Sequence, residues 1–286
     1  MGSAHPDDAI LDAIAAAIVS AAGGLKGLKR ELGELLRDCI DGVIKTPQTG
    51  RRLYAELQNS EKTYIGTCVE IDLRDRLKFH RGSQLDLDIA GTEVDVKFSA
   101  GISWMIPPEA MGRPCVIISA DDTKGLCCFG LFIARLEYLN ASNRDQKRSP
   151  SKFGRSNIRW LFKDEPYPMN FWQTVSKETT ARIASGRSGN ERIVTLFREV
   201  VDRPISRKIV EDVAAQRDFM RRLRGDGGGG TRDVLARDRV VLLCGTWAND
   251  QRLIRELNLP AVSRSEFMSH QVADEEMAIV KGLGFL

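Results

Sequence analysis

One stretch of the sequence, Gln84–Ser99, constrains the fold of this chain more than any other. It alternates polar and apolar residues on both sides of Ala90-Gly91, which is the pattern of two half-buried strands joined by a tight turn. The apolar side chains, which we expect on one face, are Leu85, Leu87, Ile89, Val94, Val96 and Phe98. The other face would carry Asp86, Asp88, Glu93, Asp95 and Lys97. The stretch therefore predicts a β-hairpin with one apolar and one strongly charged face.

The acids of the charged face indicate a metal site. If Ala90-Gly91 is a two-residue loop, Asp86 lies opposite Asp95, and directly opposed like charges repel each other. A divalent cation would reverse that penalty, because hard cations take carboxylate oxygens as ligands. Lys97, two residues after Asp95, would point to the same side. Two carboxylates and a lysine around one metal are typical of phosphodiester-cleaving centres of the Asp…(Asp/Glu)-x-Lys kind. The alternative at this point is a solvated face without a function.

A predicted helix over residues 63–79 supplies a further acid. Ile65, Val69 and Leu73 repeat at four-residue spacing and form an apolar stripe. Glu70 lies on the edge of this stripe, where a carboxylate is costly unless it is paired or bound to a metal. Glu70 could therefore reach the acids of the hairpin, although an ion pair with Arg74 one turn later explains the same position equally well.

The elements around the hairpin predict an α/β layered domain. Two helices open the chain, over residues 7–21 and 25–40, and the segments 115–119 and 127–134 are typical of buried strands. The two prolines of the segment 104–109 predict a loop. Helices before and after a mixed central sheet give an α/β fold class.

Two basic segments are candidates for phosphate contacts. Lys45–Arg52 reads as an exposed turn, and the segment from Asn143 through Arg155 to Arg159 and Trp160 reads as a basic loop rich in Ser and Pro. Taken alone, each segment is more often a solvated surface than a set of phosphate contacts.

The chain length of 286 residues favours two domains. Two prolines and three charged residues within Lys163–Pro168 predict a linker, so that residues 1–163 form a catalytic domain and residues 169–286 a second domain. In the second domain we expect helices over 191–200, 205–215 and 217–224, with Asp202 as an N-cap, then a glycine-rich loop over 225–230 and a strand over 239–244. This order resembles a winged helix-turn-helix, whose third helix would present Arg221, Arg222 and Arg224 to DNA. The alternative is a helical domain with a basic surface.

Composition excludes several other classes of protein. The net charge is only +3, so any nucleic-acid contact must come from local patches. The six cysteines contain no Cys-x-x-Cys pair and there are three histidines, which predicts free thiols and no zinc site. The apolar run 9–22 is interrupted by Asp12 and lacks a positive start, so we expect an amphipathic helix of a cytoplasmic protein rather than a signal peptide or membrane span.

These residues resemble the NaeI family of type IIE restriction endonucleases over nearly the whole chain. The matching segments are Thr49-Gly50-Arg51, Glu61-Lys62-Thr63, Gly66-Thr67, Val69-Glu70-Ile71, Asp86, Ile89-Ala90-Gly91, Val94-Asp95, Lys97-Phe98-Ser99, Trp104-Met105, Pro107-Pro108-Glu109, Asn143-Arg144-Asp145 with Lys147-Arg148, and Asp218-Phe219-Met220 with Arg222, Arg224 and Gly225. The resemblance fades beyond about Pro260, where the chain is shorter than the family pattern.

The resemblance implies a homodimer with a catalytic domain of the restriction-endonuclease fold and a winged-helix-like DNA-binding domain. Each domain would hold its own double-stranded DNA, and DNA in the second domain would activate cleavage in the first. Position by position, Glu70, Asp86, Asp95 and Lys97 match the active-site residues of the family, and the three acids would hold Mg²⁺. The DNA-binding positions that we predict are Arg51, Arg144, Lys147, Arg148, Arg221, Arg222 and Arg224.

Two other functions stay open on the sequence. A repair endonuclease that nicks one strand would use the same metal centre, and a DNA-binding regulator that no longer cleaves would keep only the binding surfaces.

Overall fold

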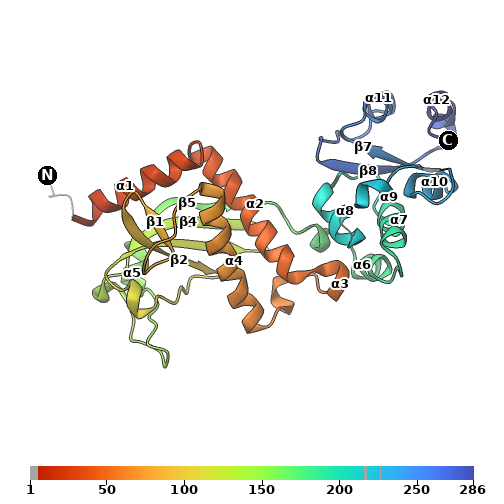
Figure 1. Cartoon of the computed structure of the whole chain (residues 1–286). Helices are drawn as coiled ribbons and strands as arrows, with labels where there is room; N and C mark the ends of the chain where they lie inside the picture. The colour runs from red at the N-terminus through yellow and green to blue at the C-terminus, as the bar shows by residue number, and fades with distance from the viewer. Residues whose placement is uncertain (1–5, 216–217, 226) are drawn as a thin grey trace. The chain divides into compact units, whose positions relative to one another are not determined.

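A mixed sheet of five strands, in the order β1-β2-β3-β4-β5, forms the centre of the N-terminal part of the computed structural model (Figure 1). The strands are β1 (Leu87–Ile89), β2 (Thr92–Ser99), β3 (Pro114–Asp121), β4 (Leu126–Ile133) and β5 (Arg159–Pro166). Strands β2 and β3 run parallel, and the other neighbours are antiparallel. The α/β class predicted from the sequence is confirmed.

Three helices cover one face of this sheet and enclose the main core. They are α1 (Pro6–Ala21), α2 (Leu25–Ile44) and α4 (Asn59–Leu77), whose apolar residues pack with Val94, Val96 and Phe129 of the strands. Short elements complete this part of the chain: η1 (Tyr54–Glu56), η2 (Pro108–Ala110), η3 (Leu136–Tyr138) and α5 (Lys152–Ser156). Over the described residues, no single helix is both long and apolar enough to cross a membrane; only the consecutive segments Asp7–Ala21 and Leu25–Thr49, taken as a pair bent by 76°, meet those two criteria.

The opposite face of the sheet is buried as well. A second core forms there from Trp104, Ile106, Cys115, Ile117 and Phe132, together with their neighbours. The Trp104 indole donates a 2.7 Å hydrogen bond to the carbonyl of Ile118, which holds the predicted loop against β3. All six cysteines are free thiols, and several of them pack in these cores as small apolar groups.

The β1–β2 hairpin has the predicted turn and register. Ala90 and Gly91 both have positive φ (53° and 77°), as a type I′ turn requires, and Asp88 pairs with Glu93. The expected position of Leu85 is wrong: this residue precedes β1 and packs in the second core with Trp104, whereas Leu87 packs in the main core. The alternation fails there because strand geometry begins only at Leu87.

The predicted linker is wrong in its position. Lys163–Pro166 is the second half of the edge strand β5, in which Pro166 pairs with Leu126 and Glu165 with Cys127. An edge strand tolerates a proline, because the missing N–H faces away from the ladder. The expected basic loop is also shorter than predicted, since Arg155 lies in α5 and Arg159 in β5, where Arg159 forms an ion pair with Asp12.

The structure describes residues 6–215, 218–225 and 227–286, and the chain divides into two compact units. The first unit includes the residues up to Ile44 and Arg52–Asn170, and the second includes Lys45–Arg51 and Phe171–Leu286. The predicted turn at 45–52 contains the short helix α3 (Thr46–Thr49), which belongs to the second unit. There the Gln48 amide donates a 3.3 Å hydrogen bond to the carbonyl of Asp212.

The second unit combines helices with a three-stranded sheet in the order β6-β8-β7. Beyond α3, its elements are η4 (Phe171–Thr174), α6 (Lys177–Ala184), α7 (Gly189–Glu199), β6 (Ile205–Ser206), α8 (Arg207–Ala214), α9 (Phe219–Arg222), α10 (Thr231–Ala236), β7 (Val240–Cys244), α11 (Ala248–Glu256), β8 (Glu266–Gln271), η5 (Asp274–Glu276) and α12 (Met277–Gly282). Helices α6 to α10 pack on one core of this unit, and α11 and α12 pack with β7 and β8 in another.

Two predictions for the helices of the second unit need correction. Ser206, not Asp202, caps α8: its hydroxyl accepts a 3.4 Å hydrogen bond from the backbone N–H of Ile209. Asp202 is instead used in tertiary contacts, which the sequence does not reveal. The predicted helix 217–224 is the shorter α9, and Arg217 lies outside the described residues.

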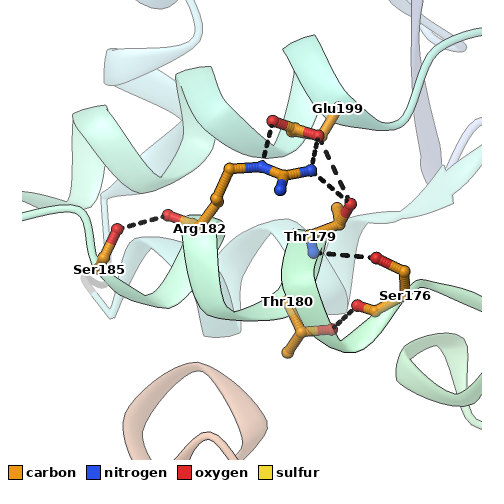
Figure 2. A network of polar contacts seen from close by, with 6 residues as sticks. All are labelled: Ser176, Thr179, Thr180, Arg182, Ser185 and Glu199. Atoms are coloured by element: carbon orange, nitrogen blue, oxygen red, sulfur yellow. Dashed lines mark hydrogen bonds and ion pairs between the residues drawn. The ribbon is translucent and has the colours of Figure 1, made fainter.

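Side-chain hydrogen bonds set the start of α6 and join it to α7 (Figure 2). The Ser176 hydroxyl accepts a 3.0 Å hydrogen bond from the N–H of Thr179, which satisfies a donor at the helix N-terminus. Arg182 forms a bidentate ion pair with Glu199, with both N–O distances 2.7 Å. This planar pairing fixes the two helices side by side.

A buried histidine links three segments of the second unit. His270 of β8 has a carboxylate against each ring nitrogen: Nδ1 lies 2.5 Å from Asp202 and Nε2 lies 2.8 Å from Glu276. A neutral imidazole has only one N–H, so two carboxylate partners favour the doubly protonated cation. Burial lowers the pKa of His270, but the hydrogen bonds to Asp202 and Glu276 outweigh it, and the pKa is raised above its ordinary value.

This contact predicts that the second unit loses stability in mild alkali. Because the pKa of His270 is higher in the folded than in the unfolded chain, its stabilising effect is complete below about pH 6.5 and is lost as the pH rises through the folded-state pKa. At each pH, the exchange rate of the β8 amides in the wild type is divided by the rate of the same amides in a His270→Gln variant. We expect this ratio to increase as the pH rises from about 6 to 8.5. Hydrogen exchange of the full chain measures this, and the same pH dependence in both proteins would contradict it.

Candidate active site

Four predicted residues come together where β2 meets the chain segment that leads into β1. Asp95 and Lys97 lie on β2, Asp86 directly precedes β1, and Glu70 lies on α4. The parallel register pairs Asp95 with Cys115 and Lys97 with Ile117 of β3. Because these β3 side chains belong to the second core, the charged residues of β2 are set beside an apolar layer rather than in water.

Lys97 is the centre of the polar contacts in this cluster. Its Nζ donates hydrogen bonds to Asp95 Oδ1 at 2.7 Å and to the carbonyl of Val96 at 3.0 Å. The same Nζ lies 3.7 Å from Asp86 Oδ2. The lysine is therefore the counter-ion of both aspartates and offsets part of the repulsion expected between them.

Asp86 is held by the backbone of β2. Its Oδ2 accepts a 2.7 Å hydrogen bond from the N–H of Val96, so Asp86 occupies the edge of β2 just beyond the end of the β1 ladder. The expected direct pairing of Asp86 with Asp95 in the ladder is replaced by this side-chain contact. Glu70 reaches Asp86 from the helix: burial raises the pKa of Glu70, and the charge of Asp86 and a hydrogen bond shared with it raise it further.

Burial dominates the electrostatics of Asp95. Only 3% of the residue is exposed, and burial raises the pKa of Asp95 to about 7 despite the ion pair with Lys97. The Cys115 thiol lies 4.0 Å from Asp95 Oδ2, whereas Lys97 bonds Asp95 Oδ1. Burial also disfavours the Lys97 ammonium, but the charge of Asp95 and its hydrogen bond outweigh this and raise the pKa of Lys97.

These side chains have the oxygen ligands that a hard cation prefers, but they are not arranged as a complete coordination site. Among the residues that the structure describes, no three His, Cys, Asp or Glu side chains are grouped so that they could hold a metal ion. Three carboxylates nevertheless converge, and Glu70 and Asp95 both have raised pKa values because the ionised forms are buried near like charge. A divalent cation relieves such crowding, and carboxylate oxygens are the ligands that Mg²⁺ prefers.

The basic residues predicted for DNA binding lie elsewhere. Arg144, Lys147 and Arg148 belong to a hairpin-like loop of the first unit, in which Asn143 N–H donates to the carbonyl of Lys147 at 2.9 Å. The Arg144 side chain is 98% exposed, and Arg148 uses one guanidinium nitrogen to bond the carbonyl of Asn140 at 3.3 Å. The remaining predicted positions, Arg51, Arg221, Arg222 and Arg224, all belong to the second unit.

Two further acids of the hairpin, Asp88 and Glu93, have no catalytic role predicted from the sequence. Glu93, on the charged face of the hairpin, accepts hydrogen bonds from Ser83 and Gln84, just before Asp86, and forms an ion pair with Arg113. Its place in the alternating pattern put Glu93 on the same face as the acids, but no local pattern indicates that it would bind the preceding loop and an arginine from the start of β3.

Comparison with known proteins places this geometry in a family. The family model described as "Restriction endonuclease NaeI" matches residues 26–280. The chain is also 35% identical over 251 residues to "Type II restriction enzyme NaeI" of Lentzea aerocolonigenes, an alignment that covers 84% of this chain and 78% of the relative. The family match runs beyond Pro260, so the expected fading of the resemblance there is wrong. The chain therefore belongs to the NaeI family of restriction endonucleases, which are site-specific deoxyribonucleases.

Proposed function

We propose that this protein is a Mg²⁺-dependent type II restriction endonuclease that cuts both strands of DNA at a specific site and is activated by a second bound DNA. The observation that carries the proposal is the convergence of Glu70, Asp86, Asp95 and Lys97 in a member of the NaeI family. One such centre cuts one strand, so cleavage of both strands calls for two centres, which a homodimer in the cytoplasm would supply.

In this proposal the three acids bind the metal ion, and Lys97 contacts the reacting phosphate. Asp86 and Asp95 would hold the Mg²⁺ ion, with Glu70 completing the set; when bound, the ion neutralises the phosphate and lowers the pKa of its water. The Val96 N–H fixes one oxygen of Asp86 and so holds this carboxylate in place. Lys97 already donates to Asp95 and the backbone, so its ammonium is positioned as a hydrogen-bond donor to charge that develops on the phosphate.

The second unit is proposed as a winged-helix-like effector domain. The order of its elements supports this proposal: α7 is followed by the short strand β6, by the helices α8, α9 and α10, and by the antiparallel strands β7 and β8. In the sheet, β8 lies between β6 and β7. The connection between β7 and β8 contains α11 in place of a simple wing. Arg221, Arg222 and Arg224 are exposed and make no hydrogen bond or ion pair within the described part of the chain, whereas Arg232 of α10 pairs with Asp250. The three arginines are therefore suited to DNA phosphates.

The hairpin-like loop of the first unit is proposed to contact the substrate DNA. Lys147 and Arg144 are exposed there, and the loop is held in shape by the Asn143 side chain, whose oxygen accepts a 2.9 Å hydrogen bond from the N–H of Lys147. A basic loop with a fixed backbone can bind phosphates without first being ordered. Arg51, which ends the segment joined to the second unit, is proposed to contact the effector DNA.

The direct test is cleavage of supercoiled plasmids of different sequence with and without Mg²⁺. We expect linear product at a fixed sequence, identified by sequencing the ends, and no product when the metal is chelated. Nicked circles alone would favour the single-strand repair endonuclease. Binding without any product would favour the DNA-binding regulator.

Activation by a second DNA is tested on a plasmid with one site. We expect added short duplexes that carry the site to accelerate its cleavage, and we expect the Arg221→Glu/Arg222→Glu variant to lose this response because reversed charges repel the duplex. The variant Arg255→Glu/Arg264→Glu is the matched control, since it makes the same charge change at exposed positions of the same unit. A wild-type protein that ignores added duplex would contradict the effector model.

A further inference from the structure

The short loop before Asp86 is fixed by a single carboxylate. Glu93 Oε1 accepts hydrogen bonds from the N–H of Ser83 at 2.5 Å, from the Ser83 hydroxyl at 2.6 Å and from the N–H of Gln84 at 3.0 Å. One carboxylate oxygen of Glu93 therefore accepts from three donors of one loop.

Arg113 completes this contact from another part of the fold. Its NH1 lies 3.2 Å from Glu93 Oε2, and its NH2 donates a 2.7 Å hydrogen bond to the side-chain oxygen of Gln84. Arg113 directly precedes β3, and its backbone pairs with Ala134 after β4. The loop is therefore tied through Glu93 and Arg113 to the rigid sheet.

The loop is also where the chain crosses from one face of the sheet to the other. Leu85 packs in the second core and Leu87 in the main core, so Asp86 lies at the crossing point on the edge of β2. Gly82 approaches the loop so closely that a Cβ on it would lie 2.5 Å from the carbonyl oxygen of Leu85. A loop packed this tightly transmits a displacement of Ser83 or Gln84 directly to Asp86.

We infer that Glu93, supported by Arg113, is a positioning residue that holds Asp86 in the orientation in which it binds the divalent cation. This inference rests on the proposed function, because it takes Asp86 as a ligand. Glu93 itself accepts bonds only from the loop and Arg113 in the described structure, and it acts through Asp86. Outer groups that orient metal ligands commonly change metal affinity by about 10- to 100-fold when removed.

The test measures Mn²⁺ binding to the full chain by electron paramagnetic resonance, without DNA or turnover. We expect Glu93→Ala to raise the Mn²⁺ dissociation constant by about 10-fold or more. Glu93→Gln keeps an oxygen that can accept from the loop and should raise it less. Arg113→Gln removes the second support, and it carries the test if Glu93→Ala does not fold.

The matched control is Asp88→Asn, which removes one charge from the residue that pairs with Glu93 across the hairpin. Asp88 Oδ1 accepts its hydrogen bond from Gly91 in the turn, not from the loop before Asp86, so we expect nearly unchanged Mn²⁺ binding. Equal weakening in Asp88→Asn and Glu93→Ala would show a general charge effect and overturn the inference. Asp86→Asn distinguishes failure of the proposed metal site from failure of the positioning role. If Asp86→Asn binds Mn²⁺ like the wild type, the proposed metal site is wrong. If Asp86→Asn loses Mn²⁺ binding while Glu93→Ala binds normally, only the positioning role of Glu93 is overturned.

Discussion

Asp95→Asn is expected to eliminate DNA cleavage while DNA binding persists. Asparagine keeps the volume and one oxygen of the side chain but removes the charge that pairs with Lys97 at 2.7 Å and that would hold the metal ion. Removing one charged member of a catalytic unit lowers the rate by about 10⁴-fold or more. The measurement is plasmid cleavage in Mg²⁺, with DNA binding followed separately in the same buffer.

Folding of this variant should be retained, because the change removes a buried charge rather than packing. The raised pKa of Asp95 means that its ionised form is less favourable in the folded than in the unfolded chain, an effect that grows as the pH rises toward about 7. Asp88→Asn, on the same hairpin, should cleave at a rate close to that of the wild type. Undiminished cleavage by Asp95→Asn would remove the catalytic assignment of this residue.

Lys97→Ala is expected to lower the cleavage rate at saturating DNA by about 10²- to 10³-fold, the usual effect of losing one donor to transition-state charge. The loss should fall on kcat and leave the affinity for DNA nearly unchanged, because a donor to developing charge contributes little in the ground state. Single-turnover cleavage with a separate DNA-binding titration distinguishes the two quantities.

Two comparisons make the Lys97 result specific. Lys97→Met keeps most of the buried volume without the charge, so it should be as slow as Lys97→Ala if the ammonium is what matters. Lys124→Ala removes an exposed lysine that forms an ion pair with the nearby Asp121, and it should cleave normally. Cleavage by Lys97→Met at the wild-type rate would assign this lysine to packing alone.

The local pattern around Ala90-Gly91 was sufficient to predict the hairpin and part of the candidate site. A two-residue turn fixes which residues face each other, and the observed pairing of Asp88 with Glu93 follows from the turn alone. The place of Glu70 at the edge of an apolar helix stripe is likewise a property of helix periodicity. These features depend on residues within a few positions of one another, and such interactions can be read from the order of the residues.

Other parts of the chain depended on partners far away in sequence. Lys163–Pro166 looked like a linker because of its prolines and charges, but pairing with β4 makes it an edge strand. Aspartate is a residue type that often caps helix N-termini, yet the carboxylate of Asp202 contacts His270, which is far away in the sequence. In each case a local preference of about 1 kcal/mol is overridden by long-range pairing and burial.

The sequence by itself determined the turn and the register and was enough to name the four candidate site residues, since these follow from side-chain alternation, helix period and family motifs. Only the tertiary structure decided that Asp95, on the charged face of β2, is buried, because β3 and its apolar neighbours come from a later part of the chain. It also decided that Glu93 binds the loop before Asp86 rather than joining the acids, because Arg113 reaches it from the start of β3. Burial and ion pairing depend on which distant segments meet, and that is a property of the folded chain.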